Sequence, residues 1–179
     1  MIPVSLYPSL RSWLVRWEGY TDYWYLDSGG VPTIGIGLAS LQAPAQDLYG
    51  DGTLDAWTAV LKEKPGYLAE NYAHATPWRA NEALLERVFQ TNLLYFYGAA
   101  IARFEGFVGC PQPAQIGSLD LYWNCGSLRK WPKFSAAFER RDWATCAVEC
   151  IETEGKPDPH RNVARRDLFL SLTGTSSAP

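Results

Sequence analysis

Apolar residues near the start of the chain recur first at the spacing of a helix and then at the spacing of a strand. An amphipathic helix is predicted over residues 8–18 because apolar side chains fall three or four positions apart, at Leu10, Trp13, Leu14 and Trp17. Extended segments are predicted over 20–26 and 31–37, and the stretch between them, Asp27-Ser28-Gly29-Gly30, is typical of a tight turn. A β-hairpin therefore follows the first helix and brings the chain back towards Glu18.

The rest of the chain follows a mostly helical pattern. Pro and Gly interrupt residues 39–75, where short helices are predicted over 54–62 and 67–72. Thr76-Pro77 has the composition of an N-cap and first turn, and apolar positions continue on one face to Phe104, which predicts a helix of roughly 40 Å. Shorter helices are predicted over residues 113–123, 133–141 and 142–153, and from an Asp158-Pro159 cap to about Gly174.

These elements predict an α+β fold that is mainly α. A chain of 179 residues suits one domain. We expect a small N-terminal lobe with a β-hairpin (about 1–75), a long connecting helix (76–105) and a helical C-terminal lobe (106–179). A cleft between two lobes is a natural binding place for an extended polymer.

Composition narrows the classes of partner. A formal net charge of −3 provides no basic surface for DNA or RNA, so no nucleic-acid partner is expected. Lys and Arg gather in the last third of the chain, where they form either a locally positive wall or ordinary solvated helix faces. The 8 Trp and 10 Tyr residues suit sugar-binding clefts as well as protein cores.

Cysteine and histidine usage predicts neither a disulfide framework nor a metal centre. Four cysteines allow three complete pairings, but Cys146 and Cys150, close together on a predicted helix, are poorly placed for a disulfide. Free, partly buried thiols are expected. His74 and His160 lack metal-type spacing to the cysteines, so no metal and no other cofactor is expected.

Two acidic residues and a hydroxyl have the properties that glycoside hydrolysis requires. That reaction needs a protonated carboxyl group to assist the leaving oxygen and a second, ionised carboxylate across the sugar ring. Glu18 follows Leu14 and Trp17 at a helix end, where apolar neighbours favour the protonated form. Asp27 lies in a polar turn, and Thr33 offers a hydroxyl that can hold water. Spacing alone fits equally a solvated helix-end Glu and a turn Asp.

A longer motif around these residues resembles a known family. Trp17-Glu18-Gly19, then Asp27, then Thr33-Ile34-Gly35-Ile36-Gly37 is similar to the signature of the T-even phage lysozymes, glycoside hydrolase family 24. The resemblance implies that Glu18 is the general acid and that Asp27 and Thr33 position the attacking water. Leu38 departs from the family, which usually has His at this position.

Two segments near the C-terminus extend the resemblance. Tyr122-Trp123-Asn124-Cys125-Gly126 resembles the family's aromatic-Asn-x-Gly helix end, which lies close to the catalytic Glu. Arg161, followed by Phe169, resembles the C-terminal Arg that pairs with that Glu. The family pattern therefore implies that Asn124 and Arg161 bind substrate or support Glu18.

The implied activity is that of an N-acetylmuramidase. Such an enzyme is a peptidoglycan hydrolase that cleaves the β-1,4 bond between N-acetylmuramic acid and N-acetylglucosamine, and the resemblance suggests inversion at the anomeric carbon. The polymer peptidoglycan is the expected partner of a monomeric enzyme, which acts as a phage endolysin or as a secreted antibacterial effector. An effector would also have an immunity protein as its inhibitor.

Three other functions stay open at this point. A lytic transglycosylase also uses one Glu, although the paired Asp27 and Thr33 favour hydrolysis. A lysozyme fold that has lost activity would act as a glycan- or protein-binding module. A cysteine or zinc amidase would need a Cys/His pair or a His-rich cluster, for which two histidines are too few.

The N-terminal residues do not resemble a signal peptide. The first twenty residues include Arg11, Arg16 and Glu18, and the longest apolar stretch, Leu93 to Ala102, is too short to span a membrane. We expect a chain made in the cytoplasm, without membrane insertion, that reaches the periplasm through a holin pore or a secretion system. A larger parent protein trimmed to this domain is the alternative.

Overall fold

The computed structural model describes residues 1–40, 42–66, 68–153 and 157–174. The chain divides into two compact units, which consist of Leu14–Asn92 and of Met1–Trp13 together with Leu93–Pro179. Helices α1 (Tyr7–Glu18) and α4 (Glu82–Arg103) each contribute residues to both units. Helices dominate and are accompanied by one small antiparallel sheet, so the predicted α+β, mainly α class is confirmed.

The unit formed by residues 14–92 contains a three-stranded sheet. Strands β1 (Thr21–Leu26), β2 (Pro32–Gly35) and β3 (Leu38–Ala39) pair antiparallel in that order. The predicted hairpin is β1 and β2, in which Tyr25 lies opposite Thr33 and Leu26 opposite Pro32. The second predicted strand is interrupted because Gly35 and Gly37 adopt positive φ angles of 65° and 66°, which turn the chain into β3.

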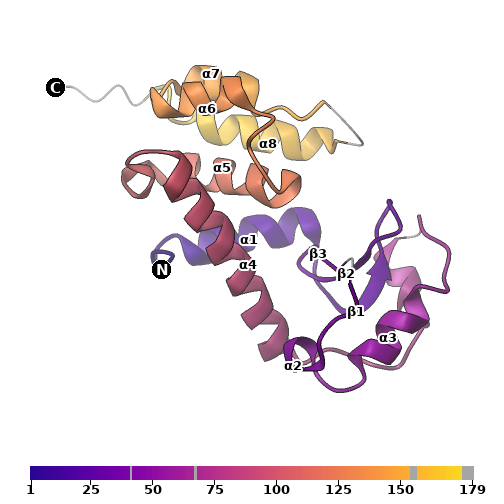
Figure 1. The fold of residues 1–179 in the computed structure, drawn as a ribbon. Coiled ribbons are helices and arrows are strands. Elements are labelled where there is room, and N and C mark those ends of the chain that lie inside the picture. The colour runs from indigo at the N-terminus through magenta and orange to yellow at the C-terminus, as the bar shows by residue number, and fades with distance from the viewer. Residues whose placement is uncertain (41, 67, 154–156, 175–179) are drawn as a thin grey trace. The chain divides into compact units, whose positions relative to one another are not determined.

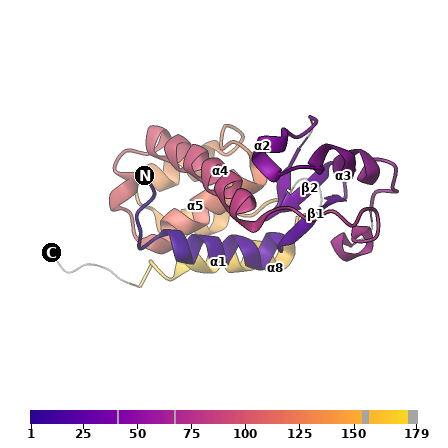
Figure 2. The same ribbon diagram turned by 90° about the horizontal axis from the view of Figure 1, so that it is seen from below.

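Short helices after the sheet cover β1. Helix α3 (Thr53–Val60) and the 3₁₀ helix η1 (Ala69–Tyr72) both pack against this strand (Figure 2), and α2 (Gln46–Tyr49) packs against α3. The buried Trp24 anchors the packing, since its indole N–H donates to Thr53 Oγ1 and its ring contacts Tyr49 edge-on. The helices predicted over 54–62 and 67–72 correspond to α3 and η1, although Tyr67 lies outside the described residues.

The long helix begins later than predicted. Thr76-Pro77 is not its N-terminus, because tertiary hydrogen bonds hold the following residues outside a helix: the Trp78 indole donates to the carbonyl of Asp51, and the Ala80 N–H to that of Asp22. Asn81 caps the helix instead, with its side chain accepting from the backbone N–H groups of residues 83 and 84. The resulting 22 residues of α4 span about 33 Å rather than 40 Å.

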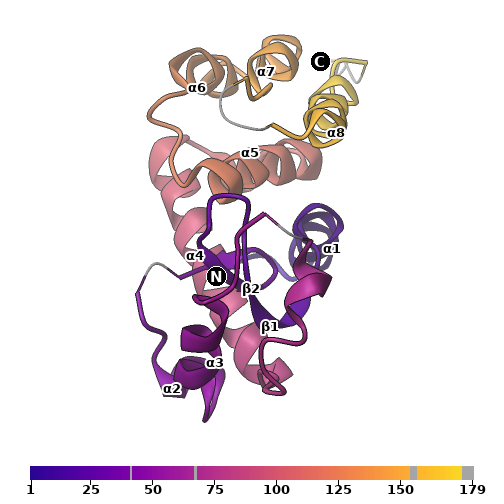
Figure 3. The ribbon, with the colours of Figure 1, turned by 90° about the vertical axis from the view of Figure 1, so that its right-hand side faces the viewer.

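Helices α5, α6, α7 and α8 of the other unit lie together in Figure 1, where their colours run from salmon through orange to yellow. Helix α8 packs against α5 and α7, and α6 packs against α7 (Figure 3). The Asp158 side chain caps α8 as predicted, by accepting hydrogen bonds from two backbone N–H groups. The helical segments of this unit are η2 (Phe107–Gly109), α5 (Gln112–Cys125), α6 (Pro132–Glu139), α7 (Trp143–Glu149) and α8 (Pro159–Leu170).

Helix α7 ends at Glu149 and not at residue 153 as predicted. Its continuation is held against α8 instead, because the backbone N–H of Glu152 donates to Asn162 Oδ1 at 3.1 Å. The Asn162 amide returns a hydrogen bond to the Glu152 carbonyl at 2.9 Å. The Asn162 side chain therefore satisfies backbone groups that would otherwise continue the helix.

Buried aromatic rings form the core of this C-terminal unit. The fully buried phenylalanines stack or meet edge-on, namely Phe104, Phe107, Phe134, Phe138 and Phe169. Gly117 lets α5 approach α8 closely, since a Cβ atom at this position would lie 2.7 Å from Phe169 Cε2. In the described part of the chain, none of the helices combines the length and the apolar composition of a membrane-spanning segment.

All four cysteines are free, as predicted. Cys110, Cys146 and Cys150 are buried and Cys125 is exposed. Burial raises the pKa of Cys146 and of Cys150 to about 12. These two thiols therefore stay protonated and unreactive at neutral pH.

Candidate active site

Glu18 is the last residue of α1 and lies against the turn between β2 and β3. A Cβ atom at position 37 would lie 2.6 Å from Glu18 Oε2 and 3.0 Å from its carboxyl carbon. Gly37 also has a φ of +66°, which side-chain-bearing residues rarely adopt. The final glycine of the Thr33–Gly37 motif is thus required by the close approach of the Glu18 carboxyl group.

Asp27 closes the hairpin turn through its side chain. Its Oδ1 atom accepts hydrogen bonds from the backbone N–H groups of Gly29 and Val31, both at 2.8 Å. Within the described part of the chain, no hydrogen bond engages its Oδ2 atom. One oxygen of the half-buried carboxylate therefore holds the turn, while the other is available to accept a proton or a hydrogen bond.

Thr33 follows on β2 and is 4% exposed. Its hydroxyl donates to the carbonyl of Val31 at 3.1 Å, which uses its single proton and leaves its lone pairs as acceptors. Val31 thus joins both side chains through its backbone, with its N–H bound to Asp27 and its C=O to Thr33. This shared residue holds two acceptor oxygens at one end of the hairpin.

Tyr25 lies directly opposite Thr33 on the neighbouring strand, and sequence reasoning missed it. Its pKa is raised to about 12, first by burial and then by the negative charges of Glu18 and Asp27. The strand pairing places Tyr25 beside Thr33, and Glu18 and Asp27 are the carboxylates whose negative charges raise the pKa of its phenol. The period-two spacing of Tyr25 and Asp27 along an extended segment is the sequence feature that indicates this proximity.

This arrangement combines a carboxyl group with two fixed hydrogen-bond acceptors. A water molecule that donates one proton to Asp27 and the other to Thr33 keeps a lone pair free for attack. The Glu18 carboxyl group can supply a proton to an oxygen of a bound ligand. The set is suited to the acid-assisted addition of water.

Asn124 and Arg161 are parts of one polar network in the C-terminal unit. Arg161 donates from Nε and Nη2 to Asp120, with the shorter bond at 2.8 Å, and Arg165 binds the second oxygen of the same carboxylate at 2.6 Å. Arg165 also pairs with Glu152 at 2.8 Å, and that carboxylate accepts a 2.5 Å hydrogen bond from the exposed Asn124. The two residues are thus linked through three others.

Helix α5 ends where its motif predicts. Gly126 is the C-cap with a φ of 68°, and its N–H donates to the carbonyl of Tyr122. Asn124 is therefore presented in the last turn of a helix. The predicted pairing of Arg161 with Glu18 stays a prediction.

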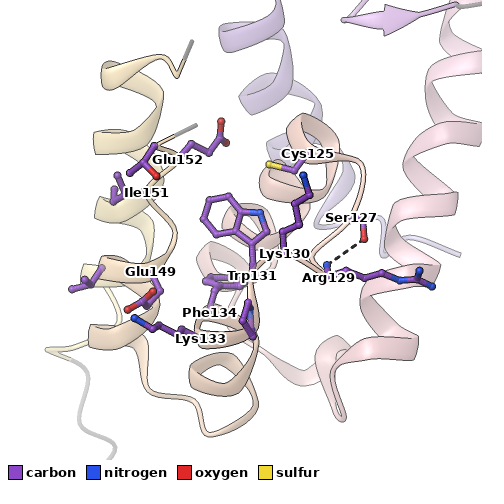
Figure 4. A pocket seen from close by; sticks show the side chains of 13 residues that line it. Cys125, Ser127, Arg129, Lys130, Trp131, Lys133, Phe134, Glu149, Ile151 and Glu152 are labelled. Carbon is purple, nitrogen blue, oxygen red and sulfur yellow. Dashed lines mark hydrogen bonds between the residues drawn. The ribbon is translucent and has the colours of Figure 1, made fainter. Parts of the chain in front are cut away.

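A pocket of about 1070 Å³ lies beside this network. Figure 4 shows the Trp131 indole in the middle of the pocket, with Lys133 and Glu149 at one end and Cys125 and Glu152 at the other. Basic and acidic side chains thus alternate with apolar ones in the lining. This part of the predicted basic C-terminal third forms a mixed surface and not a uniformly positive wall.

Metal-binding side chains do not gather anywhere in the described part of the chain. Its residues include no group of three or more His, Cys, Asp or Glu side chains able to hold a metal ion.

Comparison with known proteins finds no family model that matches the chain and no similar curated protein. The resemblance to phage-type lysozymes therefore rests on the motif residues. The geometry of these motif residues is therefore the observation from which a function is proposed.

Proposed function

We propose that this chain is an N-acetylmuramidase with a lysozyme-like fold, which hydrolyses the β-1,4 bond between N-acetylmuramic acid and N-acetylglucosamine in peptidoglycan. One observation carries the proposal: the N–H and C=O groups of Val31 hold the side chains of Asp27 and Thr33 at the same end of the hairpin. The contact of Gly37 with the Glu18 carboxyl group supports it, because it explains why the motif ends in glycine.

The proposed reaction is a single displacement by water. The Glu18 carboxyl group gives its proton to the glycosidic oxygen as the bond from that oxygen to the anomeric carbon breaks. Water, held by Asp27 Oδ2 and Thr33 Oγ1, attacks the anomeric carbon and passes one proton to Asp27. Attack on the face opposite the leaving group inverts the configuration.

The two acceptors at the hairpin end favour hydrolysis over the other candidates. A lytic transglycosylase uses an internal hydroxyl of the sugar as nucleophile and needs no group to hold water. A binding module has no need of a carboxyl group such as that of Glu18, for which Gly37 leaves room. Both the phage endolysin and the secreted effector remain compatible settings, and capture of an immunity protein from the producing cell would favour the effector.

Replacing the proposed acid tests the function directly. We expect Glu18→Gln to release reducing ends from purified peptidoglycan at least a hundredfold more slowly than the wild type, because a general acid contributes about 10²–10⁴-fold. The amide has nearly the size of the carboxyl group, so we expect the melting temperature to stay close to that of the wild type.

Glu70→Gln is the matched control, since Glu70 is an exposed carboxylate in η1 of the same unit. It is expected to retain full activity. The proposal would be contradicted if the wild-type protein released no reducing ends. It would also be contradicted if Glu18→Gln were fully active. Anhydro ends in the mass spectra of the products would replace hydrolysis with transglycosylation.

A further inference from the structure

The hydroxyl group of Tyr25 lacks a partner in the described part of the chain. The side chain is half-buried, and no hydrogen bond engages its Oη atom. Tyrosine hydroxyls usually have a hydrogen-bond partner when they are buried, and this half-buried phenol can still donate its proton to a ligand or to water. Tyr72 in the same unit does so, with its hydroxyl donating to the carbonyl of Lys64 at 2.7 Å.

The position of Tyr25 is set by the hairpin. Its Cα pairs with that of Thr33, and directly opposed residues project their side chains to the same face of a sheet. Asp27 follows two residues later and is fixed by its bond to the Val31 N–H. Tyr25 therefore presents a phenol beside the two acceptors that the proposed mechanism assigns to water.

Asp27 and Thr33 offer hydrogen-bond acceptors on this face of the hairpin, and Tyr25 adds a donor. Asp27 accepts hydrogen bonds, and Thr33 directs its only proton to the Val31 carbonyl. A sugar ring bound here presents hydroxyl and acetamido oxygens, which need donors. The phenol pKa of about 12 keeps the Tyr25 proton in place at physiological pH, so the group donates and does not act as a base.

We propose that Tyr25 is a substrate-binding residue whose hydroxyl donates a hydrogen bond to a hydroxyl or acetamido oxygen of the N-acetylated sugar bound against the hairpin. The inference rests on the proposed muramidase function and adds a contact that its three motif residues do not supply. This hydrogen bond holds the ring beside Asp27 and Thr33.

Removing the hydroxyl while keeping the ring isolates this contact. Steady-state kinetics on soluble glycan strands from peptidoglycan are expected to show a three- to tenfold lower kcat/KM for Tyr25→Phe than for the wild type. A loss of this size corresponds to the free energy of about one neutral hydrogen bond. The loss should fall mainly on KM, and the shape of the pH profile should stay unchanged. Tyr95→Phe, which removes an exposed phenol hydroxyl from α4, is the control and should match the wild type.

A binding measurement provides a readout besides activity. In the inactive Glu18→Gln background, adding Tyr25→Phe should weaken the affinity for the same uncleaved strands by a similar three- to tenfold factor, measured by calorimetry. A purely structural role would instead lower the melting temperature and leave kcat/KM and affinity unchanged.

The possible failures are distinguishable. If the wild type is active and Tyr25→Phe has the same kcat/KM and the same affinity, the inference about Tyr25 is overturned. The proposed muramidase function is then unaffected. Loss of the acidic limb of the pH profile in Tyr25→Phe would also overturn the inference, because the phenol would then act as a base. A wild type that releases no reducing ends overturns both.

Discussion

Val31 shows how a residue without a functional side chain can organise a site. Its N–H group binds Asp27 and its carbonyl binds Thr33, so two oxygens that come from different parts of the hairpin share one support. Gly37 acts in a similar way from the next turn, because the absence of a side chain leaves room for the Glu18 carboxyl group. The positions of the proposed acid and of the water site thus depend on backbone atoms as much as on the reactive groups.

Gly37→Ala tests whether activity depends on the position of the Glu18 carboxyl group, as distinct from the stability of the fold. The added Cβ would lie 2.6 Å from Glu18 Oε2 and so displace the carboxyl group, which we expect to lower kcat at least tenfold. The left-handed backbone adds a loss of about 1–2 kcal/mol in unfolding free energy. Reducing-end release and urea denaturation measure the two effects.

Gly66→Ala is the control for the backbone effect. Gly66 has a φ of +94°, but no atom lies within 4 Å of the added Cβ. This variant should lose stability and keep its kcat. Equal kcat values for the two alanine variants would mean that activity tolerates a displaced Glu18.

Helices α5 and α8 are joined by buried charge as well as by packing. Asp120 on α5 is fully buried and accepts hydrogen bonds from Arg161 and Arg165, which lie one turn apart on α8. The arginine side chains are 8% and 0% exposed, so water does little to stabilise their charge. Asp120 therefore supplies a counter-charge that both arginines need.

Asp120→Asn should destabilise the C-terminal unit strongly. It leaves two buried guanidinium groups without their shared carboxylate, and breaking such a buried pair costs about 3–5 kcal/mol of unfolding free energy. Urea denaturation followed by circular dichroism measures the loss. Asp167→Asn, which removes an exposed ion pair on α8, should leave the denaturation midpoint almost unchanged; a similar midpoint for both variants would contradict the assigned role of Asp120.

The molecule as a whole is organised by contacts between distant parts of the chain. Met1–Trp13 belongs to the compact unit formed by Leu93–Pro179, although about eighty residues lie between them. Gln112 at the start of α5 illustrates the connection, since its amide donates to the carbonyl of Ser5 at 2.9 Å. The C-terminal unit is therefore incomplete until both ends of the chain have come together.

Stability of this unit should fall at alkaline pH. Burial raises the pKa of Cys146 and Cys150 from 9.0 to about 12, so between these values the unfolded thiols have ionised while the folded ones have not. The unfolded state then binds fewer protons, and the unfolding free energy decreases with pH by up to about 1.4 kcal/mol per pH unit for each thiol.

Urea denaturation under reducing conditions from pH 8 to 11 measures this dependence. Cys150→Ala is expected to be less stable than the wild type at pH 8 but to lose stability less steeply as the pH rises. Parallel pH dependences in the two proteins would exclude a contribution from this thiol.

Features that depend on neighbouring residues could be predicted from the sequence. Helix α1 follows from apolar spacing, the hairpin from the Asp27–Gly30 turn, and the α8 cap from Asp158, because each involves groups only a few positions apart. Glu18, Asp27 and Thr33 are selected as one candidate site mainly because the motif around them resembles the phage-lysozyme signature, and not from their spacing alone. Their close arrangement follows from a hairpin that returns directly to the end of the first helix.

Other features depend on residues that meet only in the folded chain. Thr76-Pro77 has the local character of a helix start, but bonds from Trp78 to Asp51 and from Ala80 to Asp22 override it. The place of Tyr25 beside Thr33 and the shared carboxylate of Asp120 likewise require specific partners across a sheet or between helices. Local propensity is worth only tenths of a kcal/mol per residue, so a few hydrogen bonds and ion pairs between distant residues are enough to decide such positions.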